Sequence, residues 1–188
     1  MSPFEYVIVL VSIILGLGIT TILTGLAELI KHRQLRWYAP YIIWLVLVFV
    51  LHIHEWWESY SLKSIETWRL PMFLFIILYP INLYVLAHLL FPSDLKSDFN
   101  PKDFYLNNYP KFFISAIISV ILSIIHNLTI ESYHLKDQIV QFLVLVILTT
   151  FLLSRTKSNT AHIIASVFLL TIMLVSLVLT QDMLIIGN

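Results

Sequence analysis

Six long apolar segments are the feature that most constrains this fold. They lie at about 4–30, 38–60, 71–91, 111–130, 138–153 and 160–186. A helix of about 20 apolar residues crosses the ~30 Å hydrocarbon core of a bilayer. Hydrophobic residues make up 59% of the 188 residues and charged residues 12%, which is too little charge to cover a water-facing surface. We therefore predict an all-α, polytopic transmembrane helical bundle of six spans, forming a single domain over 1–188.

The basic residues predict how these spans are oriented. The connections after the first, third and fifth spans contain eight of them, Lys31, Arg33, Arg36, Lys96, Lys102, Lys111, Arg155 and Lys157, whereas the opposite side has Lys63, Arg69 and Lys136. Short cytoplasmic loops carry an excess of lysine and arginine. We therefore expect the segment 92–110 to be a cytoplasmic loop and both termini to lie outside.

Composition and missing motifs exclude several classes of protein. The formal net charge is zero and no cysteine is present, so neither nucleic acid binding nor thiolate chemistry is expected. The segment 54–58 begins like the zinc-protease pattern His-Glu-x-x-His but ends in Glu58, so the second zinc ligand is absent. All lysines lie at helix ends or in loops. We assign no catalytic residue and no metal site, and we expect no enzymatic reaction.

Polar side chains recur along single faces of the predicted spans. The polar ribbon positions are Ser115, Ser119, Ser123, His126, His162, Ser166, Ser176, Thr180, His52 and Glu55. Around the end of the second span, His52 and Glu55 group with Trp56 and Ser59, and His54 faces away together with Glu58. A polar group facing hydrocarbon has no partner, so each ribbon should face protein or water. Two alternatives follow: the ribbons pack helices closely, or they line a hydrated path.

The first span carries small residues on two arcs. They are Ser12, Gly16, Gly18, Thr20, Thr24 and Gly25. Small residues let transmembrane helices approach closely, and two arcs exceed what one neighbour in a small bundle needs. We therefore predict that this span forms a homo-oligomer interface.

Pro80 and Asn82 interrupt the middle of the third span. Proline removes a backbone hydrogen bond and kinks a helix, so this position is a candidate hinge. The alternative is that Asn82 bonds a carbonyl that the proline leaves free.

Histidines occur at two depths of the predicted bundle. His52 and His126 belong to the outer half, and His88 and His162 lie near the inner end. Two histidine pairs at two depths are what two b-type haems would need, so haem b is the one cofactor for which the sequence offers ligands. The requirement is that the second and fourth spans, and the third and sixth, face each other.

The amino-terminal third carries a resemblance to other proteins. Phe4-Glu5-Tyr6, the stretch from Ser12 to Gly18, the turn Lys31-His32-Arg33, and His52 with Trp56-Trp57 resemble a group of small uncharacterised bacterial inner-membrane proteins. The resemblance covers about the first sixty residues. It implies a multi-pass location in the bacterial inner (plasma) membrane and no activity.

Three functions are compatible with these patterns. The first is a homo-oligomeric pore, channel-like protein or membrane effector subunit, with the polar ribbons facing the bundle interior. The second is a b-type haem or other ligand-binding redox protein that uses the intramembrane histidines. The third is a structural or docking subunit of a membrane complex, with a protein partner at the cytoplasmic loops. In each case the lipid bilayer is the surrounding medium.

Overall fold

The computed structural model describes residues 2–31, 37–94, 98–131 and 133–180, with side chains as far as Val178. Within these ranges the chain is helical and has no strands. The helices are α1 (Pro3–Lys31), α2 (Ala39–Glu58), α3 (Leu70–Leu89), α4 (Pro101–Thr129), α5 (Ile139–Ser154) and α6 (Asn159–Thr180), with short 3-10 helices η1 (Ser59–Ser64) and η2 (Leu135–Gln138). Among the described residues, six helices are long and apolar enough to cross a membrane, so the all-α prediction is confirmed.

Prolines mark where the first four helices begin. Pro3, Pro40, Pro71 and Pro101 each lie at the first or second position of a helix. Proline suits this position because the amide it lacks would have no helical partner there. For all the helices except α4, the predicted start agrees with the structure to within about one residue.

The start of the fourth helix was predicted wrongly. α4 begins at Pro101, not near residue 111, so half of the predicted loop 92–110 is helical and Pro110 lies inside the helix. The Asn100 side chain caps the start by accepting a bond from the Lys102 amide at 3.0 Å. Tyr105 and Tyr109 are both buried. Together with the partly buried Phe104 and Leu106, they extend the apolar face of the span into a stretch that also contains several polar residues, and this packing stabilises the extra turns.

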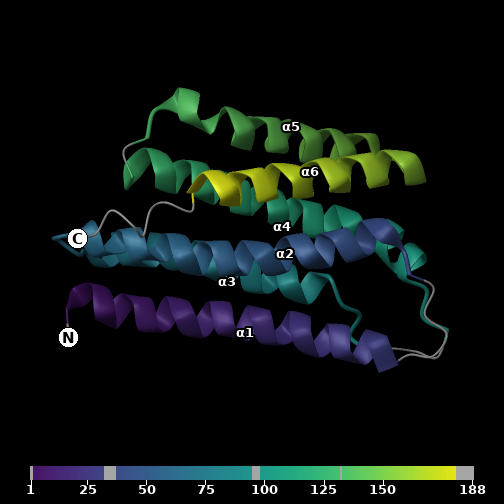
Figure 1. The fold of residues 1–188 in the computed structure, drawn as a ribbon, viewed down its shortest axis with the longest axis horizontal. Coiled ribbons are helices and arrows are strands. Elements are labelled where there is room, and N and C mark those ends of the chain that lie inside the picture. The colour runs from purple at the N-terminus through teal and green to yellow at the C-terminus, as the bar shows by residue number, and fades with distance from the viewer. Residues whose placement is uncertain (1, 32–36, 95–97, 132, 181–188) are drawn as a thin grey trace.

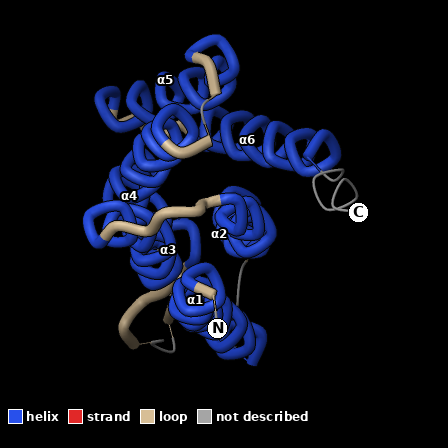
Figure 2. The backbone as a smooth tube through the Cα atoms, turned by 90° about the vertical axis from the view of Figure 1, so that its left-hand side faces the viewer, coloured by secondary structure: helices blue, strands red, loops and turns tan. Residues whose placement is uncertain are grey.

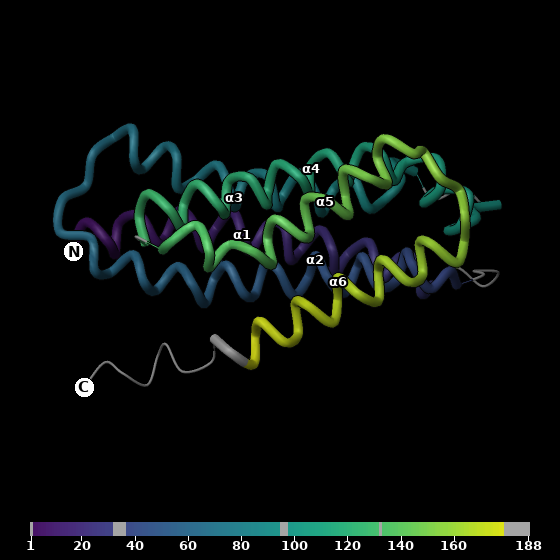
Figure 3. Tube along the Cα trace, turned by 90° about the horizontal axis from the view of Figure 1, so that it is seen from above, coloured from purple at the N-terminus to yellow at the C-terminus, as the bar shows by residue number. Residues whose placement is uncertain are grey.

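The helices pack as two groups. α1, α3, α4 and α5 follow one another as a row, and α2 and α6 lie side by side on one face of that row. Successive helices run in opposite directions, so the amino terminus and the end of α6 lie toward the same end of the bundle (Figure 1). Figure 3 shows α6 crossing at an angle to its neighbours. Which end faces the cytoplasm stays a prediction, and Arg33, Arg36 and Lys96, on which it partly depends, lie outside the described residues.

One face of α1 is committed to contacts within the chain. Its buried positions are three and four residues apart: Val7, Val11, Leu15, Gly18, Ile22, Gly25 and Leu29. A Cβ atom on Gly18 would overlap the His52 imidazole of α2, and one on Gly25 would overlap the Phe91 ring. Both glycines therefore allow α1 to approach its neighbours in the same chain, which corrects their assignment to an oligomer interface.

The other small-residue arc of α1 remains at the surface. Gly16 has no atom within 4 Å of where its Cβ would lie. Thr20 and Thr24 are exposed, and Ser12 is partly buried. The homo-oligomer prediction therefore concerns this arc alone.

Candidate ligand cavity

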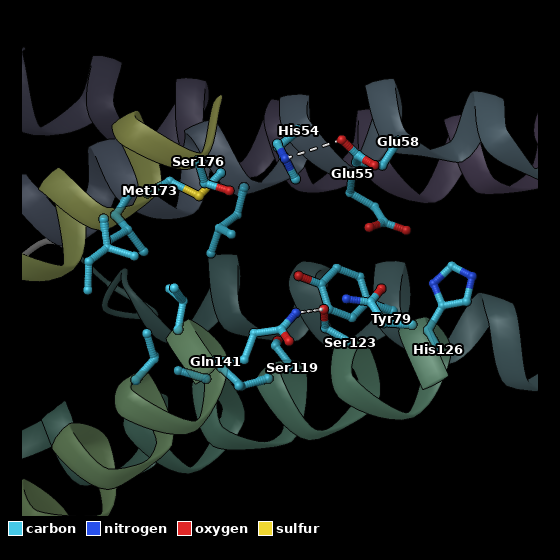
Figure 4. Close-up of a pocket in the computed structure, with 18 of the residues that line it drawn as sticks. His54, Glu55, Glu58, Tyr79, Ser119, Ser123, His126, Gln141, Met173 and Ser176 are labelled. Atoms are coloured by element: carbon cyan, nitrogen blue, oxygen red, sulfur yellow. Dashed lines mark hydrogen bonds and ion pairs between the residues drawn. The ribbon is translucent and has the colours of Figure 1, made fainter. Parts of the chain in front are cut away.

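A cavity of about 310 Å³ lies between the two groups of helices. α2 and α6 form one wall, and α3, α4 and α5 form the other (Figure 4). Its volume falls at the lower end of the range for small-molecule sites, about 300–1,000 Å³. A space of this size inside a helical bundle is large enough for an organic ligand.

Aromatic rings close the cavity at one end. Trp44 lines it and packs against Phe112 and Phe113, with ring centroids 5.3 and 5.1 Å apart. Beyond them, more rings pack around His162. We call this group the aromatic layer: Trp44, Tyr105, Tyr109, Phe112, Phe113, Phe151 and His162. Of these seven side chains only Trp44 lines the cavity, so its described lining stops at this layer.

A single stripe of α2 supplies both apolar and ionisable lining. Trp44, Leu47 and Leu51 are followed at helical spacing by His54, Glu55 and Glu58, and all six line the cavity. The grouping expected from the sequence is therefore wrong: Glu55 belongs with His54 and Glu58, not with His52. His52 is fully buried on the opposite side of α2, where it meets Gly18 of α1.

The cavity is acidic at the end away from the aromatic layer. Its described lining contains Glu55, Glu58 and Glu131 but no lysine or arginine. His54 Nε2 lies 3.5 Å from Glu58 Oε1, and the Ser61 hydroxyl donates to Glu131 Oε1 at 2.7 Å. Tyr133, in the connection between α4 and η2, lies close enough to feel this negative charge. Burial raises the pKa of its phenol, and the carboxylates of Glu131 and Glu58 raise that pKa further.

Glu55 differs from the other two acids because its carboxylate has no hydrogen bond or ion pair with any described side chain. It points across the cavity toward Tyr79 of α3 and His126 of α4 (Figure 4). His126 Nε2 is buried and also has no hydrogen-bond partner. The Gln141 side chain donates to Ser123 Oγ at 3.0 Å, which leaves its buried Oε1 without a donor. Buried polar atoms in native proteins are normally paired, so the two unpaired atoms of His126 and Gln141, together with the unpartnered Glu55 carboxylate, mark a place where a ligand can bind.

A polar network between α3 and α4 borders the cavity. Asn82 Nδ2 donates to the Ser115 carbonyl at 2.8 Å and to Ser119 Oγ at 2.7 Å, and the Ser115 hydroxyl donates to Asn82 Oδ1 at 3.2 Å. Asn82 therefore links two helices, and the expectation that it bonds a carbonyl freed by Pro80 is wrong. Pro80 is buried within α3, and its role as a hinge stays a prediction.

Replacing Asn82 with alanine should destabilise the bundle by about 1–3 kcal/mol, because three bonds between helices are lost and two buried serines are left without partners. Asn108→Ala is the matched control, since the Asn108 amide bonds only the Phe104 carbonyl of its own helix. Thermal unfolding in a mild detergent measures both variants. Equal losses would show that the network contributes nothing beyond an ordinary helix-surface bond.

The predicted ribbon of α6 divides between packing and cavity. His162 and Ser166 are both buried, and the Ser166 hydroxyl donates to the His162 carbonyl at 2.7 Å. Ser176 lines the cavity. Thr180 ends the helix, and its side chain, like residues 181–186 of the predicted span, lies outside the described part of the chain.

In neither predicted histidine pair do the two side chains face the same space. His52 faces α1 whereas His126 lines the cavity. His88 is exposed, and its Nδ1 lies 3.3 Å from the Tyr84 carbonyl of the same helix. His162 is buried with both ring nitrogens bonded, Nδ1 to the Tyr105 hydroxyl at 2.9 Å and Nε2 to the Thr156 carbonyl at 3.0 Å. A haem iron would have to replace one of these bonds.

The sequence predictions included five of the residues around the cavity and missed others. Ser119, Ser123, His126, Ser176 and Glu55 were candidates and do line it, whereas Ser115 faces Asn82. His54, Glu58, Glu131 and Tyr79 were not chosen as site residues. His54 and Glu58 continue the spacing of Trp44, Leu47 and Leu51, which is a signal that sequence reasoning can use. Glu131 lies in a connection, where helical spacing gives no guidance.

Comparison of the chain with family models, with curated proteins and with solved structures finds no match. In the described ranges, no group of three or more His, Asp or Glu side chains is placed to hold a metal ion.

Proposed function

We propose that this chain is a multi-pass membrane protein that binds a small, largely apolar molecule with one polar end. The observation that carries the proposal is the cavity itself. Its floor is aromatic, its side walls are aliphatic, and its polar groups gather at the opposite end. Ligand sites in proteins commonly combine apolar walls with a few converging polar groups. Such a protein serves as a receptor or as a transporter that carries its ligand into or across the bilayer.

The sequence-based alternatives have less support. A continuous pore through one chain is disfavoured by the aromatic layer, so a conducting path would have to run between chains, where the arc of Gly16, Thr20 and Thr24 would be the contact. Haem b would have to displace the bonds of His162. A docking role at the cytoplasmic side stays a prediction, and residues 32–36 and 95–97 of the loops concerned lie outside the described residues. A bacterial inner-membrane location with both termini outside remains part of the proposal, and it rests on the basic residues and the resemblance of the first sixty residues.

Partly filling the cavity with a larger side chain should weaken ligand binding. Trp44 lines the floor, so a brominated probe bound there should quench its fluorescence. We expect 4-bromobenzyl alcohol to quench the wild-type protein in nanodiscs, and Trp44→Phe to remove that component. Val144→Phe, on the cavity side of α5, should raise the probe concentration needed for half-maximal quenching by at least about tenfold.

The matched control is Val146→Phe, the same substitution on the exposed face of the same helix, where Val146 is 63% exposed. It should bind the probe like the wild type. Quenching that is independent of Trp44, or that survives Val144→Phe unchanged, would place the probe outside the cavity and contradict the proposed function.

A further inference from the structure

We infer that the ligand of this cavity is an organic cation and that the Glu55 carboxylate is its counter-charge. This inference rests on the proposed function and adds the chemical class of the ligand. A cation of this kind has one positively charged nitrogen and an apolar body, so it matches a cavity that is acidic at one end and aromatic at the other.

The charge of the lining is one-sided. Three acids approach the same end of the cavity from different segments: Glu55 and Glu58 from α2, and Glu131 from the connection after α4. The other ionisable side chains in the described lining at this end are His54, His126 and the phenols of Tyr79 and Tyr133. No described lining residue carries a permanent positive charge. An anionic ligand would therefore meet repulsion without any compensating partner.

Of the three acids, Glu55 is the one whose carboxylate has no partner among the described side chains. Glu58 Oε1 lies 3.5 Å from His54 Nε2, within ion-pair distance but without a hydrogen bond, and Glu131 accepts a bond from Ser61. Glu55 has neither kind of partner among the described residues, and its side chain extends into the space between the two walls of the cavity (Figure 4). A charge enclosed by protein and apolar walls needs a counter-charge or hydrogen bonds. A bound cation supplies the counter-charge.

Further groups on the opposite wall suit the same ligand. Gln141 Oε1 is a buried acceptor with no donor, and a neutral His126 can accept through Nε2. The Tyr79 ring beside Glu55 and the Trp44 ring on the floor can both face a cation or its apolar body. The lone pairs of Gln141 Oε1 and His126 Nε2 and the faces of the two rings carry negative partial charge, which favours a positively charged nitrogen, with or without N–H groups, over a negatively charged head.

The competing arrangement is an internal pair between Glu55 and His126. If a small side-chain rotation brought Glu55 and His126 together, each would have the other as its partner. No cation would then be needed, and the cavity would prefer an uncharged ligand. The two arrangements differ in one measurable property, which is whether removing the charge of Glu55 affects cationic ligands selectively.

Three isosteric probes test the inference in nanodiscs of zwitterionic lipid, with Trp44 quenching as the readout. They are the cation 4-bromobenzyltrimethylammonium, its uncharged carbon analogue 1-bromo-4-neopentylbenzene, and the anion 4-bromophenylmethanesulfonate. We expect the wild type to bind the cation at least about tenfold more tightly than the uncharged analogue and not to bind the anion. Glu55→Gln should weaken cation binding at least about 30-fold, the loss expected when one partner of an enclosed charge pair is removed, and should leave the uncharged analogue unchanged.

Glu66→Gln is the matched control, because it makes the same chemical change at an exposed position in the connection before α3. It should leave all three affinities unchanged. Equal binding of the cation and its uncharged analogue, with no effect of Glu55→Gln, would overturn this inference and leave the proposed cavity function standing. Failure of all three probes to quench Trp44 would overturn both.

Discussion

Gly18→Leu is expected to destabilise the protein by at least about 3 kcal/mol, the upper part of the range for overpacking a close-packed core. Gly18 is buried in the contact between α1 and α2, and any Cβ there would overlap the His52 ring. The ring cannot move away easily, since its Nδ1 lies 2.7 Å from the Val48 carbonyl and must donate to it. Small residues at such crossings let helix backbones approach closely.

Gly16→Leu is the matched control for this substitution. It lies two residues away on the same helix, and open space surrounds its Cβ position, so its thermal unfolding should match that of the wild type when both proteins are monomeric. Gly18→Ala should also cost less in a His52→Ala background than in the wild type, because the two side chains occupy one space. Equal destabilisation by leucine at both glycines would contradict the contact.

Native mass spectrometry of Gly16→Leu separately tests the homo-oligomer prediction. An unchanged assembly would show that the surface arc of α1 is not its interface.

His162→Ala is expected to cost about 3–5 kcal/mol, comparable to truncating a large buried aromatic side chain. His162 is 1% exposed and packs against Tyr105, Tyr109 and Phe151. Its hydrogen bonds assign the tautomer. A carbonyl can only accept, so Nε2 donates to Thr156 and Nδ1 of the neutral ring accepts the Tyr105 hydroxyl. Alanine leaves a void, an unpaired carbonyl and an unpaired phenol.

His88→Ala is the control, because His88 is exposed on α3. Its thermal unfolding midpoint should stay near that of the wild type. Tyr105→Phe removes only the hydroxyl and should cost about 1–2 kcal/mol, less than His162→Ala. If both histidine variants unfolded at the same temperature, the aromatic layer would not be a centre of stability. A haem ligand at His162 would instead be signalled by loss of visible absorbance in His162→Ala.

Helix number and helix face could both be predicted to a large extent. The six apolar stretches, and the prolines that begin four of them, are local properties of the sequence. α4 shows the limit. The segment around Asn100 and Asp103 reads as a polar loop, yet Tyr105 and Tyr109 give it an apolar face that becomes useful only when α2 and α6 are there to cover it.

The candidate site was harder to predict, because helical spacing alone does not tell which neighbour each polar side chain faces. On α2, Glu55 lies at the edge between the stripe of His54 and Glu58 and the stripe of His52, so its assignment required knowing which neighbours pack on each side. Glu131 joins the cavity from a connection, and Asn82 bonds a helix more than thirty residues away in the chain. None of these relations has a counterpart in local sequence.

What the sequence by itself determined is the elements: a chain this apolar satisfies its backbone hydrogen bonds within helices, and six of those in the described residues are long and apolar enough to cross a bilayer. What only the tertiary structure decided is which polar side chains pair with each other and which face a shared space. In hydrocarbon every polar group needs a partner, but many partners are possible in principle. The packing of α2 against α1 gives His52 its place in a helix contact. The packing of α2 and α6 over α3, α4 and α5 places His162 in the aromatic layer and directs Glu55 into the cavity.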